Sequence, residues 1–197
     1  MTKSVHQYLI TLKGITPPIW RRILVPDDYS FWDLHVAIQD SMGWMDYHMH
    51  VFRIKPKHAH NTIEIGIPNE DRFIDEPEIH PDWEYSIDTF FSQVGLKCEY
   101  EYDFGDGWIH EVLLEGILLK EKDQKYPRCI GGARACPPED CGGVMGFENL
   151  LHTISDPKDD EYEEMMAWLG GSYNPEEFDP EKVKFDNPKI RWRKAFK

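Results

Sequence analysis

The chain has 197 residues and carries 36 acidic residues against 22 basic ones, so its formal net charge at pH 7 is −14. A charge of this size repels phosphate backbones and argues against broad binding of nucleic acid. The sequence contains neither the apolar core of a signal peptide nor a run of about 18 apolar residues. We therefore expect a cytoplasmic protein that does not span a membrane.

The first half of the chain alternates between strand and helix patterns. Apolar residues alternate over 5–12 and again over 19–25, which predicts two strands. The clearest helix of the chain follows, because Ser30 is a good N-cap, Asp33 completes a capping box and Gly43 stands just after the apolar stripe. Two more strands and a shorter helix are then predicted at 48–54, 62–67 and 86–95.

A hairpin over 98–119 organises the second half of the chain. Cysteine and tyrosine residues alternate with acidic ones, and an Asp-Gly pair marks the turn, so one face is apolar and the other is acidic. We interpret the acidic face as a solvated surface that is partly neutralised by Arg21, Arg22 or Arg128. Beyond the hairpin, apolar residues at helical spacing predict two helices near 147–154 and 162–170.

These elements predict an α+β fold. A mixed, mainly antiparallel sheet of about six strands carries the first helix across one face, and the C-terminal helices pack at an end or side. No linker divides the chain, so we expect one domain over residues 1–183 and a basic tail over 184–197. The tail contains Trp192 and Phe196; it either contacts nucleic acid or an acidic partner, or it packs back on 156–164. We favour an intramolecular or flexible tail.

Five short motifs occur in an order that is typical of one protein family. The motifs are Gly14-Ile-Thr-Pro-Pro-Ile-Trp-Arg-Arg22, Met42-Gly-Trp44 with His48 and His50, Tyr102-Asp-Phe-Gly-Asp-Gly-Trp-Ile-His110, Tyr126-Pro-Arg-Cys129 and Arg134-Ala-Cys-Pro-Pro-Glu-Asp-Cys-Gly-Gly143. Over residues 7–183 the sequence resembles the Ri-plasmid open-reading-frame-three-like family of insertion-element passenger proteins.

This resemblance implies an α+β fold and an association with mobile elements. It implies no mechanism, because the family is largely uncharacterised. Recombinase chemistry, which the name of some members suggests, needs a nucleophilic serine among arginines that clamp a phosphate. No such serine adjoins the arginine pairs of this sequence.

Three cysteines, Cys129, Cys136 and Cys141, follow the hairpin in a segment rich in glycine and proline. Such a segment can fold back on an ion, and thiolates with a fourth nitrogen ligand make a tetrahedral zinc site. His110 is our first candidate for the fourth ligand, since its strand leads into the segment, and His50 is the second. The alternative is a tight turn whose sulfurs are buried or oxidised to each other.

A second candidate site involves histidines and aspartates. His48 and His50 lie two residues apart in a predicted strand, so both imidazoles point to one face. If that strand neighbours the hairpin, they form a cluster with Asp103, Asp106 and His110. Such a cluster can hold a divalent metal ion with an open position for water, as metal-assisted hydrolysis requires. The alternative is that these histidines are hydrogen-bonded structural residues.

Two classes of function follow from these features. The first is a non-enzymatic binding or adaptor module that recognises a protein or peptide, with Arg21, Arg22 and Trp108 as contact residues. The second is a metal-dependent hydrolase built on the histidine and aspartate cluster. We favour the first class, because no complete catalytic constellation can be read from the sequence.

Overall fold

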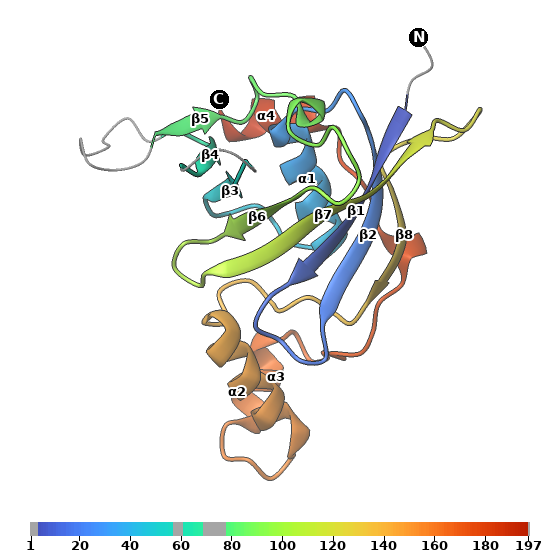
Figure 1. Cartoon of the computed structure of the whole chain (residues 1–197). Helices are drawn as coiled ribbons and strands as arrows, with labels where there is room; N and C mark the ends of the chain where they lie inside the picture. The colour runs from blue at the N-terminus through green and yellow to red at the C-terminus, as the bar shows by residue number, and fades with distance from the viewer. Residues whose placement is uncertain (1–3, 57–60, 69–77, 197) are drawn as a thin grey trace.

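Eight strands form one sheet around which the rest of the chain is arranged (Figure 1). The computed structural model describes residues 4–56, 61–68 and 78–196. The strands are β1 (Ser4–Leu12), β2 (Ile19–Pro26), β3 (His50–Ile54), β4 (Ile63–Gly66), β5 (Ile79–Pro81), β6 (Lys97–Tyr102), β7 (Trp108–Leu119) and β8 (Arg128–Ala133). Their order in the sheet is β5-β4-β3-β6-β7-β1-β2-β8, and all neighbours are antiparallel except β4 and β5.

The helices occupy two places relative to this sheet (Figure 1). Helix α1 (Phe31–Met42) packs on the sheet with α4 (Pro188–Ala195) beside it, whereas α2 (Gly143–Ser155) and α3 (Tyr162–Trp168) pair with each other. Two short 3₁₀ turns, η1 (Ile87–Thr89) and η2 (Pro180–Lys182), complete the elements. None of the described helices is long and apolar enough to cross a membrane. The predicted α+β class is confirmed.

Helix α1 begins and ends where its capping residues predict. The Ser30 side chain accepts a hydrogen bond from the Asp33 backbone, and Asp33 accepts one in return from the Ser30 backbone. This reciprocal pair satisfies two backbone donors that a helix end otherwise leaves free. Because the sheet covers one side and α4 another, the helix is buried on nearly its whole circumference, and it forms the centre of the core.

The hairpin of β6 and β7 turns its apolar face into this core, as predicted. Cys98, Tyr100 and Tyr102 are buried, and the Tyr100 ring packs against Phe52 of β3 with the ring centroids 4.7 Å apart. The return strand contributes Trp108, which is 1% exposed. Trp108 is therefore a core residue, and the prediction that it contacts a partner is wrong.

The acidic face of the hairpin is neutralised in part by Arg22, one of the three arginines that we predicted, which pairs with Glu115 of β7. Other cations also contribute: Arg53 of β3 forms an ion pair with Glu101, and Lys97 of β6 lies 2.6 Å from Glu111. These pairs are partly or largely exposed, so each contributes little to stability. The face is a solvated surface, as expected, and its counter-charges come from neighbouring strands and from the hairpin itself.

The structure contains two strands more than predicted, and both lack a usable pattern. Strand β5 has only three residues, and β8 contains consecutive glycines in the segment that we interpreted as a cysteine loop. Gly132 allows the Phe178 ring to lie against the strand, since a Cβ atom at this position would stand 2.2 Å from the ring. The glycines thus serve close packing, which removes the alternation by which strands are recognised.

The predicted helix over 86–95 is wrong, because only the single turn η1 forms there. The Gly95 backbone amide instead donates to the Leu114 carbonyl at 2.9 Å, and the Leu114 amide donates to the Leu96 carbonyl at the same distance. The chain is therefore already pairing with β7 at residues that the helical pattern had included.

The basic tail forms helix α4, which packs on α1. Arg191 lies 2.6 Å from the Asp40 carboxylate, and the Trp192 ring packs edge-on against Trp32 with the ring centroids 5.1 Å apart. The tail is thus intramolecular, but the expected contact with the acidic stretch 156–164 is wrong. The tail instead contacts an acidic residue of α1 and packs in a cluster of tryptophans.

Two stacked histidines lie in the core beneath α4. The rings of His35 and His50 are parallel within 8° and their centroids are 3.5 Å apart. His35 Nε2 lies 2.8 Å from Asp46, and His50 Nε2 lies 2.8 Å from the fully buried Asp82. The second ring nitrogen of His35 lies 2.8 Å from the Tyr100 hydroxyl. His50 is therefore held as a structural residue.

Burial controls the protonation of two core histidines. Burial first, and then the adjacent His50 ring, lower the pKa of His35 from 6.5 to about 4. Burial likewise lowers the pKa of His110 to about 4. Between pH 6.5 and 4 the unfolded chain therefore binds protons that the folded protein does not bind. Under this linkage, stability is lost as the pH falls through that window.

We expect the free energy of unfolding to fall by up to about 1.4 kcal/mol per pH unit for each of these two histidines over that window. Urea denaturation at a series of pH values measures the slope. His110→Gln removes one such group and should flatten the slope, whereas the exposed His152→Gln should leave it unchanged. A folded His110→Gln protein with the original slope would contradict this account.

Candidate metal centre

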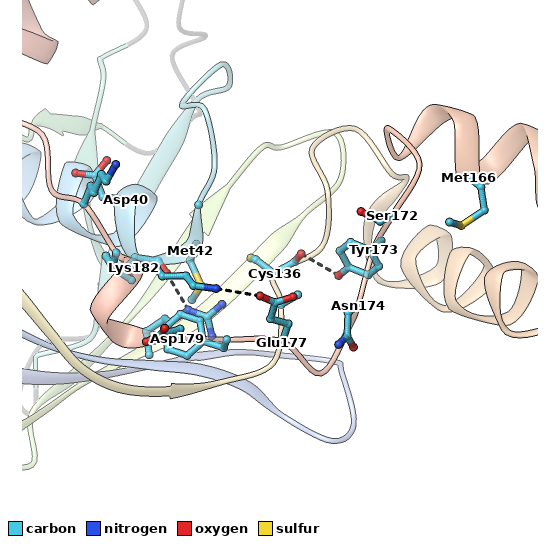
Figure 2. Close-up of a pocket in the computed structure, with 17 residues that line it drawn as sticks. Asp40, Met42, Cys136, Met166, Ser172, Tyr173, Asn174, Glu177, Asp179 and Lys182 are labelled. Carbon is cyan, nitrogen blue, oxygen red and sulfur yellow. Dashed lines mark hydrogen bonds and ion pairs between the residues drawn. The ribbon is translucent and has the colours of Figure 1, made fainter.

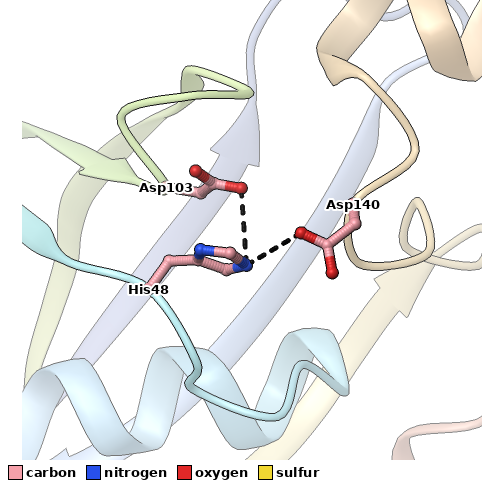
Figure 3. A group of neighbouring side chains, drawn as sticks. All are labelled: His48, Asp103 and Asp140. Carbon is pink, nitrogen blue, oxygen red and sulfur yellow. Dashed lines mark ion pairs between the residues drawn. The ribbon is translucent and has the colours of Figure 1, made fainter.

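Three segments bring His48, Asp103 and Asp140 together beside the hairpin (Figure 3). His48 lies just before β3, Asp103 follows β6 directly, and Asp140 lies in the loop that leads to α2. His48 Nε2 is 3.1 Å from Asp140 Oδ1 and 3.7 Å from Asp103 Oδ2. A third carboxylate, that of Glu139, approaches the same nitrogen to 3.9 Å through Oε2.

Hydrogen bonds orient the two more buried carboxylates. Asp103 Oδ1 accepts from the Gly105 backbone amide at 2.9 Å, which leaves Oδ2 directed at His48. Glu139 Oε1 accepts from the Met45 amide at 2.6 Å, and the Tyr102 hydroxyl donates to the same carboxylate. One oxygen of each group is thus occupied by the backbone, and the other faces the cluster. Such fixed outer contacts are what orient ligands in metal sites.

The backbone is strained at both aspartates of the cluster. Asp103 has a φ of 55° and Asp140 a φ of 57°, so both residues are in the left-handed region. Residues other than glycine adopt this region at a cost of order 1–3 kcal/mol, and such residues concentrate at functional sites. Here the strained conformation turns both carboxylates towards one histidine.

The hairpin turn docks on the loop that carries Asp140. The Gly142 amide donates to Asp106 Oδ2 at 3.2 Å, and the Gly143 backbone lies against the Asp106 carbonyl. A Cβ atom on Gly143 would stand 2.4 Å from that carbonyl oxygen, so only glycine permits the approach. This contact holds Asp103 and Asp140 at their observed separation.

The cluster has an excess of negative charge. Within the described ranges, no lysine or arginine lies within 4 Å of Asp103, Glu139 or Asp140, and His48 is their only ion-pair partner. The side chains of Asp103 and Glu139 are 10% and 17% exposed, so water screens them incompletely. Like charges held together in a partly buried place are costly unless a cation joins them.

The geometry suits a divalent cation. One ligand atom from each of His48, Asp103 and Asp140 lies within 4.8 Å of the other two. An octahedral ion with ligands at about 2.1 Å places adjacent ligand atoms about 3 Å apart. The 3.1 Å distance between His48 Nε2 and Asp140 Oδ1 already fits this spacing, and small rotations of the carboxylates would bring the other ligand atoms to it. One imidazole with carboxylate oxygens is a donor set for Mn²⁺, Fe²⁺ or Zn²⁺ rather than for a thiolate-selective ion.

Two hollows border the cluster on its solvent side. A cavity of about 360 Å³ is lined by Asp140 and by residues of α2 and α3, including Trp168. A second cavity, of about 500 Å³, is lined by Glu139 and Trp44 and also reaches Trp168. Each of these spaces reaches the cluster through one of its carboxylates, Asp140 or Glu139.

The structure assembles part of the cluster that the sequence predicts. His48 and Asp103 meet as expected, and Asp106 positions the loop instead of pointing at the histidine. His50 turns away to Asp82, although it follows His48 by two residues. His110 is fully buried, with Nδ1 at 3.3 Å from the Tyr100 carbonyl, and it is absent from the cluster.

Sequence reasoning missed Glu139 and Asp140, the acidic residues between two of the cysteines. The motif Cys136-Pro-Pro-Glu-Asp-Cys141 drew attention to its sulfurs, and its carboxylates were left aside. The indication that could have revealed them is the Gly-Gly pair after Cys141, since consecutive glycines permit the close approach of another backbone.

The geometry gives no support to the predicted zinc loop. Cys129, Cys136 and Cys141 are free thiols, and in the described chain they do not join His110 in a group of three ligand atoms within 4.8 Å. Burial raises the pKa of the Cys136 thiol well above its usual range and that of Cys141 to about 12. Both thiols are therefore protonated at neutral pH in the metal-free protein, and a zinc ion would have to displace their protons.

Of the two arginines predicted to contact a partner, one is buried. Arg21 is 1% exposed, so it cannot contact a partner at the surface. Arg22, on the other face of β2, is partly exposed and forms a two-point contact with Glu115, with nitrogen–oxygen distances of 2.6 and 3.0 Å. We expected both guanidinium groups to be free for a partner at the surface, and neither is.

Residues 4–182 match the model of one protein family, described as plasmid pRiA4b ORF-3-like protein. The chain belongs to this family. It is 30% identical over 176 residues to the uncharacterized protein y4hQ of Sinorhizobium fredii, a match covering 87% of this chain and 84% of that protein. It is also similar to a crystal structure of a protein of unknown function, MM3350 from Methanosarcina mazei Go1, with 38% identity and a TM-score of 0.84.

That alignment covers 94% of this chain and 100% of the archaeal one. The resemblance seen in the sequence motifs is therefore confirmed, and it extends over nearly the whole fold. Since both relatives are described without a function, they supply an architecture and no activity. What the protein does has to be argued from its own residues.

Gly143→Ala tests the docking of the hairpin turn. We expect a loss of stability beyond the roughly 1 kcal/mol of left-handed strain, because the new Cβ atom meets the Asp106 carbonyl. Gly170→Ala is the matched control, since that glycine also has a positive φ but nothing within 4 Å of its Cβ position. Urea denaturation of both proteins measures the difference, and equal losses would contradict the close contact.

Proposed function

We propose that this protein is a binding module whose centre at His48 takes a divalent metal ion, with Asp103, Asp140 and Glu139 as carboxylate ligands. The observation that supports this function is the orientation of the acids: backbone amides hold Asp103 Oδ1 and Glu139 Oε1, the Tyr102 hydroxyl holds the Glu139 carboxylate, and Asp103 Oδ2 and Glu139 Oε2 face His48 Nε2. A bound cation would also relieve the uncompensated charge of the three acids.

In this proposal each residue has a distinct part. His48 supplies the nitrogen ligand, and Asp103 and Glu139 supply oxygens that are already oriented by the backbone. Asp140, with 68% of its side chain exposed, closes the centre from the solvent side. Because ligands that are oriented in advance lose little freedom on binding, the site needs only a small adjustment to become a metal centre.

Hydrolysis assisted by the metal is the second candidate function. The observation that favours it is the exposure of Asp140 beside the 360 Å³ cavity, since an ion there would keep positions for water and for a substrate. A divalent ion lowers the pKa of bound water and polarises a carbonyl or phosphoryl oxygen. The adaptor role, the protein or peptide partner and the mobile-element association remain expectations from sequence.

Metal binding is tested on protein purified without an affinity tag. We expect isothermal titration with Mn²⁺ and Zn²⁺ to give one site per chain, and His48→Gln or Asp140→Asn to weaken it by at least about tenfold. Asp160→Asn removes an exposed acid elsewhere and is the matched control. Binding that survives both substitutions would remove this centre, and zinc that persists in His48→Gln protein would point back to the cysteines.

The hydrolytic alternative has a separate test. If it holds, bis(4-nitrophenyl) phosphate or a p-nitrophenyl ester should be cleaved by the Mn²⁺-loaded protein and not after treatment with a chelator. Asp103→Asn should abolish that cleavage, because it removes an oriented ligand of the ion. A protein that binds Mn²⁺ through His48 but cleaves neither probe is a binding module only.

A further inference from the structure

Arg21 is the most buried arginine in the described part of the chain. Its side chain is 1% exposed, and it donates from Nε to the Ser41 carbonyl at 2.8 Å. Its Nη1 atom donates to the carbonyls of Trp20 and Ala133 at 2.8 and 3.0 Å. Three neutral acceptors therefore hold the guanidinium in one orientation. In the described residues, Nη2 has no hydrogen-bond acceptor in the protein.

No acidic side chain compensates this buried charge. Within the described residues no carboxylate lies within 4 Å of Arg21, although the protein carries 14 more acidic than basic residues. Four other arginines each pair with a carboxylate, namely Arg22, Arg53, Arg134 and Arg191. A buried charge without a counter-charge is costly in a protein interior, so the site is arranged for an anion that comes from outside.

Arg21 lines a cavity with a volume of about 660 Å³ (Figure 2). The end of α1, the Cys136 backbone and the segment 172–184 form its walls. Figure 2 shows the hydrogen bond that the Tyr173 hydroxyl donates to the Cys136 carbonyl, which connects this wall of the cavity to the cysteine segment. A space of this size matches the cavities that bind small organic ligands.

The carboxylates around the cavity already have partners. Glu177 lies 3.2 Å from Lys182 (Figure 2). Asp40 lies 2.6 Å from Arg191, and Asp179 accepts from the Glu181 backbone amide. The lining also contains Lys184, which has no ion pair among the described residues. The cavity thus offers uncommitted positive charge while its negative charges are engaged.

We propose that this cavity binds the carboxylate group of a small organic ligand, about the size of an amino acid or dipeptide, with Arg21 as the counter-charge. Arg21 Nη2 donates to the ligand, and the Phe178 ring, 3.7 Å from the guanidinium carbon, keeps its plane fixed. The exposed Ser172 and Asn174 at the rim face the rest of the ligand.

The charge of the lining selects the kind of anion. Three cationic and three acidic side chains line the cavity, so its formal charge is zero before a ligand enters: Arg21, Lys182 and Lys184 against Asp40, Glu177 and Asp179. Because the lining is neutral overall, a monoanion adds one uncompensated charge and a phosphate dianion adds two, so the dianion is the less favourable ligand. A zwitterion adds no net charge. This site does not depend on the proposed metal centre.

Titration with alanyl-alanine, acetate and inorganic phosphate tests the proposal. In an NMR spectrum of the arginine side chains, alanyl-alanine and acetate should shift the Nε–Hε signal of Arg21, and phosphate should not. Arg21→Gln should weaken alanyl-alanine binding by at least about tenfold, the effect expected for one hydrogen bond to a charged group. Arg22→Gln, on the opposite face of the strand, is the matched control and should bind normally.

Because Arg21→Gln can lose stability, a second variant keeps the test decisive. Ser172→Trp changes an exposed rim residue and fills the mouth of the cavity, so it should abolish binding while the melting temperature stays unchanged. The proposal is overturned if neither carboxylate binds at about 10 mM, if phosphate alone binds, or if Ser172→Trp binds alanyl-alanine as the natural sequence does.

Discussion

The candidate centre depends on one backbone contact, the approach of the hairpin turn to Gly142 and Gly143. The hairpin supplies Asp103 and the loop supplies Asp140, and these segments are 37 residues apart in the chain. Without a side chain on Gly143, the loop reaches the Asp106 carbonyl and brings both acids to the same histidine. Aspartate tolerates the left-handed φ of both residues, which at Asp103 is helped by the local bond to the Gly105 amide, and the docking holds the two conformations together.

Local rules predicted the elements that are stabilised locally. The capping box at Ser30 and the alternation in the hairpin identified α1, β6 and β7, because the reason for each element lies within a few neighbouring residues. Strand β8 and the end of the predicted helix at Gly95 were missed for the opposite reason. The Phe178 ring packs against Gly132, and the Gly95 amide donates a hydrogen bond to β7. Neither partner is near its glycine in the sequence.

The candidate site was half predictable for the same reason. His48 and Asp103 could be paired because the strand and hairpin patterns allowed their segments to be neighbours in a sheet. Glu139 and Asp140 lie in an irregular loop, whose path is decided by docking and not by periodicity. His50 shows the converse: its spacing from His48 suggested a shared role, but the buried Asp82 and the stacked His35 ring hold it in the core.

The order of strands in the sheet constrains how the chain can fold. The first strand has β7 and β2 as its neighbours, and Ser4 is in register with Leu119. Helix α1 is covered only when Arg191 reaches Asp40, across 151 positions of sequence. During synthesis β1 can pair with β2 and α1 can pack on it, but the other edge of β1 and the outer side of α1 stay uncovered until β7 and α4 emerge, and contacts of this long range slow folding.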